Sequence, residues 1–155
     1  MDLPRVSRRI ITTSRTLRKL LMLQETSSGS VKIISLDRER LLARLKIIAA
    51  RIYADHPDVV SVRLFGSVAR GDQVGLSDVD ILVVVREKLP NPLVEIQRFY
   101  PYFDLPVGVD ILVYSEPQIQ AGLQKNDPFI SQVWAESLDL CGERQVRESI
   151  YDERE

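Results

Sequence analysis

The chain has 155 residues, of which 45% are hydrophobic and 28% are charged, and its formal net charge at pH 7 is −1. These values are typical of one folded domain, and a chain of this length buries enough surface to fold with neither a disulfide nor a structural metal. Cys141 is the one cysteine, which excludes an internal disulfide and favours a cytoplasmic location. His56 is the one histidine, which excludes a multi-histidine metal cage. No apolar run reaches the ~18 residues of a membrane span.

The first 34 residues differ in charge from the rest of the chain. They hold seven Lys or Arg residues against two acidic residues, and Ser27-Ser28-Gly29-Ser30 is typical of a flexible link. Three interpretations stay open: a basic arm for an acidic partner or nucleic acid, a transit peptide, or a loose extension. We expect a flexible basic extension over residues 1–34, one domain over 35–142 and a charged tail over 143–155.

Hydrophobic periodicity predicts a helix at the start of the domain and strands after it. Apolar residues recur at steps of three and four over 41–52, and His56-Pro57 ends that helix. The period then changes to two over 59–64, which predicts a strand. A Gly-Ser turn and one helical turn over 68–71 follow. The run 79–85 is apolar on both faces, which predicts a central strand.

The sequence of the second half of the domain predicts alternating helices and strands. A proline-rich turn at 89–92 precedes a helix through Tyr100, and a strand is expected over 107–114. Residues 116–138 are expected to be helical with a break at 126–128. The pattern contains neither an internal repeat nor an interdomain linker. Together these elements predict an α/β (α+β) fold class, with a small mixed central β-sheet flanked by helices.

Three aspartates on the predicted strands lack a neighbouring basic residue. Asp78 and Asp80 are two residues apart at the head of a strand, so both carboxylates project from one face, about 7 Å apart. Asp110 lies between apolar residues and can share that face if its strand pairs beside the first. Burying such charges alone is costly, whereas Mg²⁺ accepts carboxylates together with phosphate oxygens. Three carboxylates on adjacent strands are the requirement for a two-metal phosphoryl- or nucleotidyl-transfer site.

The Gly-Ser turn supplies groups that can bind a phosphate. Gly66 lets the backbone approach a phosphate closely, and the Ser67 hydroxyl and neighbouring N–H groups can bind its oxygens. The guanidinium of Arg70 suits paired phosphate oxygens, although it could instead form a surface ion pair with Asp72. The alternative without a catalytic role is that Asp78 caps a turn and Asp80 is a solvated charge.

These residues match the pattern of a known family. Gly66-Ser67, ten further residues and Asp78-x-Asp80 form the signature of the polymerase-β-like nucleotidyltransferases, and Asp110 falls where that family has its third carboxylate. The longer string Gly-Ser-x-Ala-Arg-Gly … Ser-Asp-x-Asp-Ile-Leu-Val resembles the minimal nucleotidyltransferases (MNT), and the resemblance covers roughly residues 36–142. It implies the polymerase-β-like fold, ATP as substrate, and two Mg²⁺ ions held by Asp78 and Asp80, with Asp110 on one ion beside the attacking hydroxyl.

The resemblance also implies a function and a partner. MNT proteins are commonly encoded beside HEPN toxins and transfer AMP from ATP to a tyrosine of the toxin. It therefore implies a protein adenylyltransferase antitoxin whose partners are ATP and a cognate HEPN-type toxin. Two alternatives stay open: a non-catalytic module that occludes the toxin, and a small-molecule nucleotidyltransferase that works as an oligomer. Only 45 residues follow Asp110, so we expect another molecule to supply most of the acceptor surface. We expect no direct binding of nucleic acid by the domain.

Overall fold

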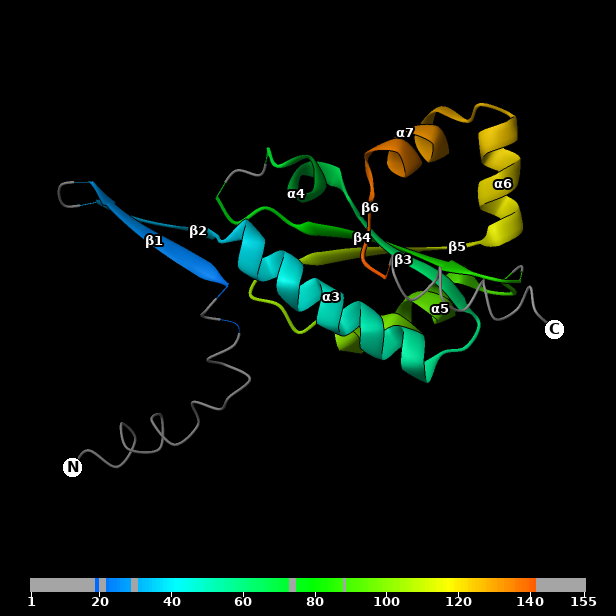
Figure 1. The fold of residues 1–155 in the computed structure, drawn as a ribbon, viewed down its shortest axis with the longest axis horizontal. Helices are drawn as coiled ribbons and strands as arrows, with labels where there is room; N and C mark the ends of the chain where they lie inside the picture. The colour runs from blue at the N-terminus through cyan, green and yellow to red at the C-terminus, as the bar shows by residue number, and fades with distance from the viewer. Residues whose placement is uncertain (1–18, 20–21, 29–30, 73–74, 88, 142–155) are drawn as a thin grey trace.

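The computed structural model describes residues 19, 22–28, 31–72, 75–87 and 89–141, and its centre is a four-stranded mixed β-sheet (Figure 1). The strand order is β5-β4-β3-β6; β3 is antiparallel to β4 and β6, and β4 and β5 are parallel. The strands are β3 (Val59–Phe65), β4 (Val79–Val85), β5 (Val109–Ser115) and β6 (Leu138–Asp139). The helices are α3 (Arg38–Asp55), α4 (Gly66–Arg70), α5 (Pro92–Phe99), the 3₁₀ turn η1 (Tyr100–Tyr102), α6 (Glu116–Gln124) and α7 (Pro128–Glu136).

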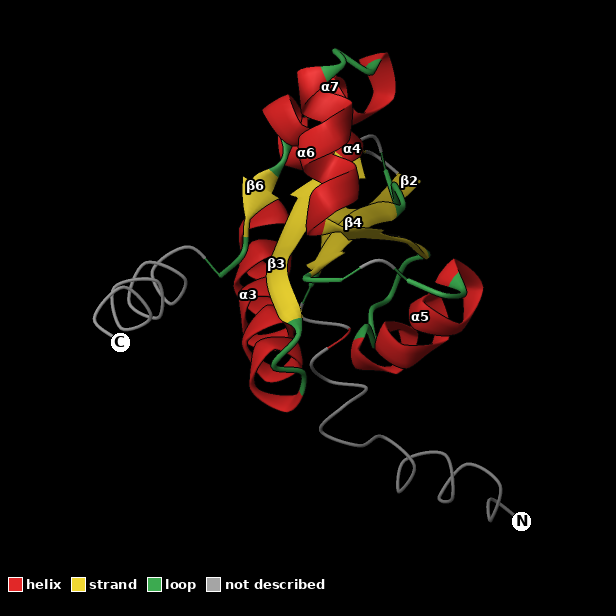
Figure 2. Ribbon diagram, turned by 90° about the vertical axis from the view of Figure 1, so that its right-hand side faces the viewer, coloured by secondary structure: helices red, strands yellow, loops and turns green. Residues whose placement is uncertain are grey.

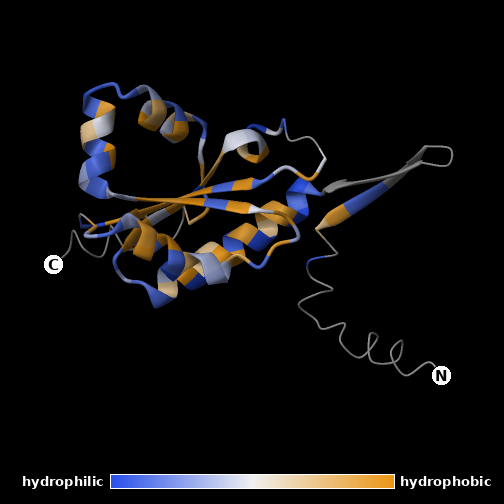
Figure 3. Cartoon of the chain, turned by 180° about the vertical axis from the view of Figure 1, so that it is seen from behind, coloured by the Kyte–Doolittle hydropathy of each residue, from blue (hydrophilic) through white to orange (hydrophobic). Residues whose placement is uncertain are grey.

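Helices cover both faces of this sheet. α3 and α5 lie on one face, and α6 and α7 lie on the other (Figure 2). The larger hydrophobic core includes Ile81 and Val83 of β4, and the smaller core includes Leu82 and Val84 of the same strand. The strands in the middle of the fold are mostly hydrophobic, as Figure 3 shows. Because β4 contributes to both cores, it is the central strand that its apolar sequence predicts.

Side-chain caps determine where three of the helices begin. Asp37, Ser115 and Asp127 accept hydrogen bonds from backbone N–H groups in the first turns of α3, α6 and α7, respectively. The helical spacing over 41–52 is confirmed by α3, whose inward side chains are fully buried. These side chains are Leu41, Leu45, Ile48 and Ile52.

The structure corrects the expectation of a flexible extension in part of residues 1–34. β1 (Leu23–Ser28) and β2 (Val31–Leu36) pair antiparallel as a hairpin that projects from the rest of the fold (Figure 1). Met22, just before β1, is only 3% exposed, and its carbonyl accepts a hydrogen bond from the Asp37 N–H at 2.8 Å. Strand pairing and burial of Met22 therefore order residues 22–28 and 31–34. Lys19 forms an ion pair with Asp104, and the remaining residues of 1–34 lie outside the described ones.

The predicted mixed sheet flanked by helices is confirmed, with one additional edge strand. The sequence patterns do not predict β6, which follows α7 directly and pairs with Arg63 and Leu64 of β3. The helical region expected over 116–138 is present as α6 and α7 with a break at 125–127, close to the expected 126–128, but α7 ends at Glu136 and Leu138 belongs to β6. The predicted tail, 143–155, lies outside the described residues. Among the helices that the structure describes, none combines the length and apolar character needed to cross a bilayer.

Candidate active site

Asp80 and Asp110 lie next to each other on two parallel strands. Asp80 is the second residue of β4 and is paired in register with Asp110, the second residue of β5. Neighbouring strands are about 4.8 Å apart, and residues in register on parallel strands point to the same face. Leu82, two residues after Asp80, lies in the smaller core, so both carboxylates are on the α6/α7 side of the sheet. The strand pairing on which the expectation for Asp110 depended is therefore present.

Two glycines make room for the carboxylates of Asp78 and Asp80. Asp78 immediately precedes β4, and a Cβ added to Gly108 would lie 2.6 Å from its Oδ1 atom. A Cβ added to Gly66 would overlap Asp80 Oδ2 and lie 3.0 Å from Asp80 Cγ. Because each glycine leaves the space that one carboxylate occupies, larger residues at 66 or 108 would displace these side chains.

Asp80 is at the centre of an acidic cluster. Burial raises the pKa of Asp80 above its ordinary value of 3.8, and the carboxylates of Asp110, Asp78 and, more weakly, Glu136 raise this pKa too. Arg70 opposes the shift. Asp80 is half-buried, whereas Asp78 and Asp110 are exposed. Such a concentration of negative charge favours binding of a cation or of a cation–phosphate complex.

The metal-binding role of the three aspartates stays a prediction. In the conformation seen, no three His, Cys, Asp or Glu side chains of the described residues converge closely enough to hold a metal ion. The donor set nevertheless fits a hard cation, since carboxylate oxygens are preferred ligands of Mg²⁺. The exposed carboxylates of Asp78 and Asp110 can also change rotamer at little cost, because neither is enclosed by the core.

The Gly-Ser turn lies beside Asp80 because of the antiparallel pairing of β3 with β4. Phe65, the last residue of β3, is paired with Asp80, and α4 begins at the next residue. Gly66 has φ +77°, a conformation that glycine adopts without strain, and Gly71 ends α4 with φ +80°. Ser67 is half-buried in the first turn of α4. Its predicted contact with a phosphate, like that of Gly66, stays a prediction.

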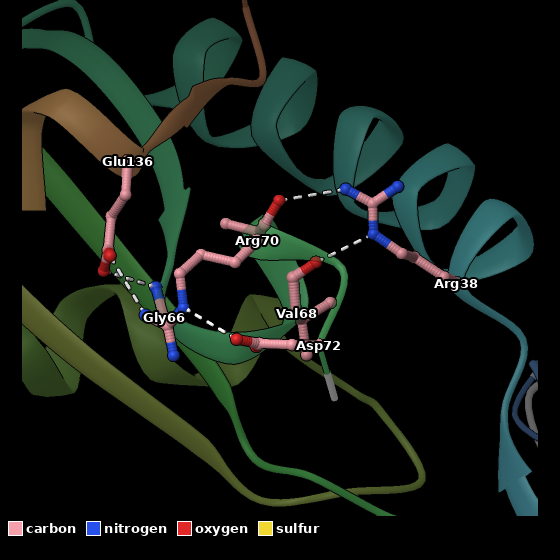
Figure 4. Close-up of polar contacts among 7 residues, drawn as sticks. Arg38, Gly66, Val68, Arg70, Asp72 and Glu136 are labelled. Atoms are coloured by element: carbon pink, nitrogen blue, oxygen red, sulfur yellow. Dashed lines mark hydrogen bonds and ion pairs between the residues drawn. The ribbon is translucent and has the colours of Figure 1, made fainter. Parts of the chain in front are cut away.

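Arg70 is bound by two carboxylates in this structure. Its Nε atom donates to Asp72 Oδ2 at 3.1 Å, and its Nη1 atom donates to Glu136 Oε2 at 3.0 Å (Figure 4). The surface pair with Asp72, which was the alternative to a phosphate role, is thus present. Glu136 also accepts a hydrogen bond from the Gly66 N–H, at 3.1 Å to Oε1. The two carboxylate oxygens of Glu136 therefore join α7 to both ends of α4.

Arg38 holds the same turn from the opposite side. Arg38 is in the first turn of α3; its Nε atom donates to the Val68 carbonyl at 2.8 Å, and its Nη2 atom donates to the Ala69 carbonyl at 3.0 Å (Figure 4). The planar guanidinium satisfies two adjacent carbonyls of α4 at once, which a lysine ammonium cannot match. α4 is consequently held between Arg38 and Glu136.

Replacing Arg38 by lysine should destabilise the fold by about 1–2 kcal/mol, the cost of losing charge-assisted hydrogen bonds to carbonyls. Chemical denaturation of the wild type and of Arg38→Lys measures this difference. Arg40→Lys is the matched control, because Arg40 lies in the same turn and its ion pair with Asp37 is largely exposed. We expect the control to change stability by less than about 0.5 kcal/mol. Equal losses in both variants would show that the two hydrogen bonds of Arg38 contribute nothing specific.

Sequence reasoning did not identify Arg38 and Glu136 as parts of the site. Their contacts span 30 and 31 residues for Arg38 and 66 and 70 residues for Glu136, so no local spacing pattern contains them. The only available signal was the position of Glu136 at the end of the last predicted helix. Asp78, Asp80 and Asp110, by contrast, stand out because charged residues interrupt apolar strands.

Comparisons with known proteins identify the family of the domain. The family profile described as the nucleotidyltransferase domain matches residues 45–141. A crystal structure of a candidate nucleotidyltransferase from Sulfolobus solfataricus is similar, with 29% identity, 54% of this chain and 75% of that chain covered, and a TM-score of 0.47. A toxin–antitoxin crystal structure with AMP-PNP is 22% identical, covers 72% of this chain and 86% of that chain, and has a TM-score of 0.42. No curated protein sequence matches the chain.

Proposed function

The chain belongs to the nucleotidyltransferase domain family, and from that premise we propose that it transfers AMP from ATP to a tyrosine hydroxyl of a HEPN-type toxin. The observation that carries the transferase reaction is the arrangement of Asp80 and Asp110. Two carboxylates lie in register at the starts of parallel strands, beside the Gly66-Ser67 turn. Candidate metal ligands and candidate phosphate-binding groups therefore lie together at one end of these strands. The toxin partner and a cytoplasmic setting rest on the resemblance to the minimal nucleotidyltransferases and on the sequence.

The cation that this chemistry requires would be held by Asp78, Asp80 and Asp110. We assign two Mg²⁺ ions to these carboxylates, as in the family resemblance. When bound, the ions supply Lewis-acid stabilisation of phosphate charge. The raised pKa of Asp80 supports this assignment, because a cation would relieve the repulsion among the three carboxylates. Gly66 and Gly108 leave the space that the carboxylates of Asp80 and Asp78, respectively, occupy.

The chain's own groups would then orient the two reactants. Gly66 and Ser67 would hold the distal phosphates, so that the α-phosphorus lies above Asp80. Asp110 would accept a hydrogen bond from the phenolic hydroxyl and take its proton as the oxygen attacks. A bond forms between that oxygen and the α-phosphorus, and the bond between the α-phosphorus and its bridging oxygen to the β-phosphate breaks. Pyrophosphate leaves, and Arg70 can stabilise its charge once its present carboxylate partners release it.

A tyrosine is a suitable acceptor for this site. The phenol pKa of ~10 makes its oxygen easier to ionise than that of an aliphatic alcohol. We propose that another molecule presents the acceptor to this site. A protein acceptor meets that condition with its own fold.

Intact-mass spectrometry of the co-purified partner tests the proposal. With ATP and Mg²⁺, the partner should gain one or more AMP units and pyrophosphate should be released. The wild-type reaction repeated with GTP, CTP and UTP tests the choice of base. Asp110→Asn should reduce the modified fraction by at least about 10²-fold, because the carboxylate that receives the proton is lost. Tryptic mapping then identifies the modified side chain.

The outcome also separates the two alternatives. An unmodified partner that wild type and Asp110→Asn inhibit equally would support occlusion and overturn the transferase proposal for this partner. Modification of a small-molecule alcohol or aminoglycoside in place of the partner would support the small-molecule alternative.

A further inference from the structure

Glu136 occupies the positions at which the proposed function places nucleotide phosphate. Its Oε1 atom accepts from the Gly66 N–H at 3.1 Å, and its Oε2 atom accepts from Arg70 at 3.0 Å (Figure 4). Both donors are groups that we assign to the polyphosphate. A carboxylate and a phosphate present similar pairs of anionic oxygens to such donors. The two anions therefore cannot use these donors at the same time.

The position of Glu136 is determined by its neighbours at the end of α7, Trp134 and the C-cap residue Ser137. Arg63 of β3 donates from Nε to Ser137 Oγ at 2.7 Å, and its guanidinium lies 4.0 Å from the centre of the Trp134 ring. Residues on both sides of Glu136 are thus held by one side chain of the central sheet. The Glu136 side chain is only 15% exposed, compared with 42% for Arg70. Its contact with the Gly66 turn is consequently a feature of the packed fold rather than of a free surface side chain.

The negative charge of Glu136 bears on how tightly nucleotide phosphate can bind at the Gly66 turn. Asp78, Asp80, Asp110 and Glu136 place four carboxylates around the turn, and Arg70 is the cation that opposes them at Asp80. We propose that Glu136 is an internal competitor of the nucleotide, a carboxylate that binds the Gly66 N–H and Arg70 until phosphate displaces it. This inference rests on the proposed function, since it requires nucleotide at the Gly66 turn. Glu136 then acts as a positioning residue that sets nucleotide affinity through Arg70.

Binding of ATP to the full-length chain in the presence of Mg²⁺, measured by isothermal titration calorimetry, tests the proposal. Glu136→Gln keeps the size of the side chain and an oxygen for the Gly66 N–H, but removes the charge that holds Arg70. The dissociation constant for ATP should fall about 5- to 10-fold, because a charge-assisted competitor has been removed. In transfer assays KM for ATP should fall by a similar factor while kcat changes little.

Two further variants separate competition from a general effect of charge or stability. Glu116→Gln removes the same charge at the far end of β5 and should leave the dissociation constant within about 2-fold. In an Arg70→Gln background, Glu136→Gln should improve binding much less, because the donor for which the two anions compete is absent.

The outcomes distinguish failure of this inference from failure of the proposed function. If the wild type binds ATP and Glu136→Gln binds it equally well or more weakly, Glu136 is not a competitor of the nucleotide. If Glu136→Gln lowers the melting temperature and leaves ATP binding unchanged, the role of Glu136 is structural. Failure of both proteins to bind ATP would overturn the proposed function together with this inference. If Glu136→Gln binds ATP and the wild type does not, both the proposed function and the role of Glu136 are supported.

Discussion

Replacing Asp80 by asparagine should reduce nucleotidyl transfer on the order of 10³-fold, the loss typical of removing a group that supports transition-state charge. Asp80 is the half-buried one of the three aspartates; it is in register with Asp110 on one side and lies against Gly66 on the other. No other described carboxylate has both contacts, so none can replace it. Transfer to the partner, followed by intact mass, measures the loss.

The same substitution should stabilise the fold at neutral pH. Burial and the neighbouring carboxylates raise the pKa of Asp80 in the folded state, so the folded protein binds its proton more tightly than the unfolded chain. The resulting penalty is absent below the unfolded pKa near 3.8, grows as the pH rises from there through the folded pKa, and is complete above it. Asp80→Asn removes this penalty, and its melting temperature in metal-free buffer at pH 7 should equal or exceed that of the wild type.

Asp58→Asn is the matched control for this prediction. Asp58 hydrogen-bonds to Arg98, which lowers the pKa of that carboxyl, so its charge stabilises the fold above the unfolded pKa and this contribution is lost as the pH falls. Asp58→Asn should therefore melt lower than wild type at pH 7 and retain transfer activity. If metal-free Asp80→Asn also melts several degrees lower, the Asp80 carboxylate is structural and the assignment to the site is wrong.

The sequence predicts the elements that bury side chains at regular spacing. α3 follows from apolar steps of three and four, and β4 follows from a run that is apolar on both faces. The hairpin of β1 and β2 does not follow, because Leu23–Ser28 is mostly polar and Ser27-Ser28-Gly29-Ser30 is typical of a flexible link. A two-residue Gly-Ser segment between extended stretches is also a hairpin signal, and that meaning depends on pairing which local composition does not reveal.

The sequence likewise predicts some residues of the candidate site and not others. Asp78, Asp80 and Asp110 are recognisable because charge is expensive within apolar strands, and the parallel pairing of β4 with β5 then places two of them in register. The residues that hold the Gly66 turn, Arg38 and Glu136, come from helices at opposite ends of the domain. Their roles arise only from tertiary packing, because each uses an ordinary surface residue type at an ordinary helical position.

Replacing Gly66 by alanine should strongly reduce transfer by displacing the Asp80 carboxylate. An L-residue at φ +77° costs roughly 1–2 kcal/mol in backbone strain. The new Cβ would also overlap Asp80 Oδ2, so the carboxylate has to move. A displacement of about 1 Å at a reacting group can reduce the rate about 10²-fold, and we expect a loss of at least that size.

Gly71→Ala separates the backbone cost from the displacement of Asp80. Gly71 has φ +80°, nearly the same as Gly66, but the nearest atom to its added Cβ is Arg38 Nε at an ordinary 3.8 Å. Gly71→Ala should therefore lose a similar 1–2 kcal/mol of stability and less than about 3-fold of transfer by the folded protein. Equal losses of transfer in Gly66→Ala and Gly71→Ala would mean that residue 66 acts through the backbone alone.

A double-mutant cycle in stability then tests the contact itself. In Asp80→Ala the carboxylate is gone, and of the three atoms nearest to the added Cβ at residue 66 only the Cβ at residue 80, 3.3 Å away, would remain. Gly66→Ala should thus destabilise Asp80→Ala by little more than Gly71→Ala destabilises the wild type, whereas in the wild-type background it should cost more. A coupling energy above about 0.5 kcal/mol between residues 66 and 80 is the expected result, since contacting residues are not additive. Strict additivity would show that the glycine is required for a reason other than the carboxylate that lies against it.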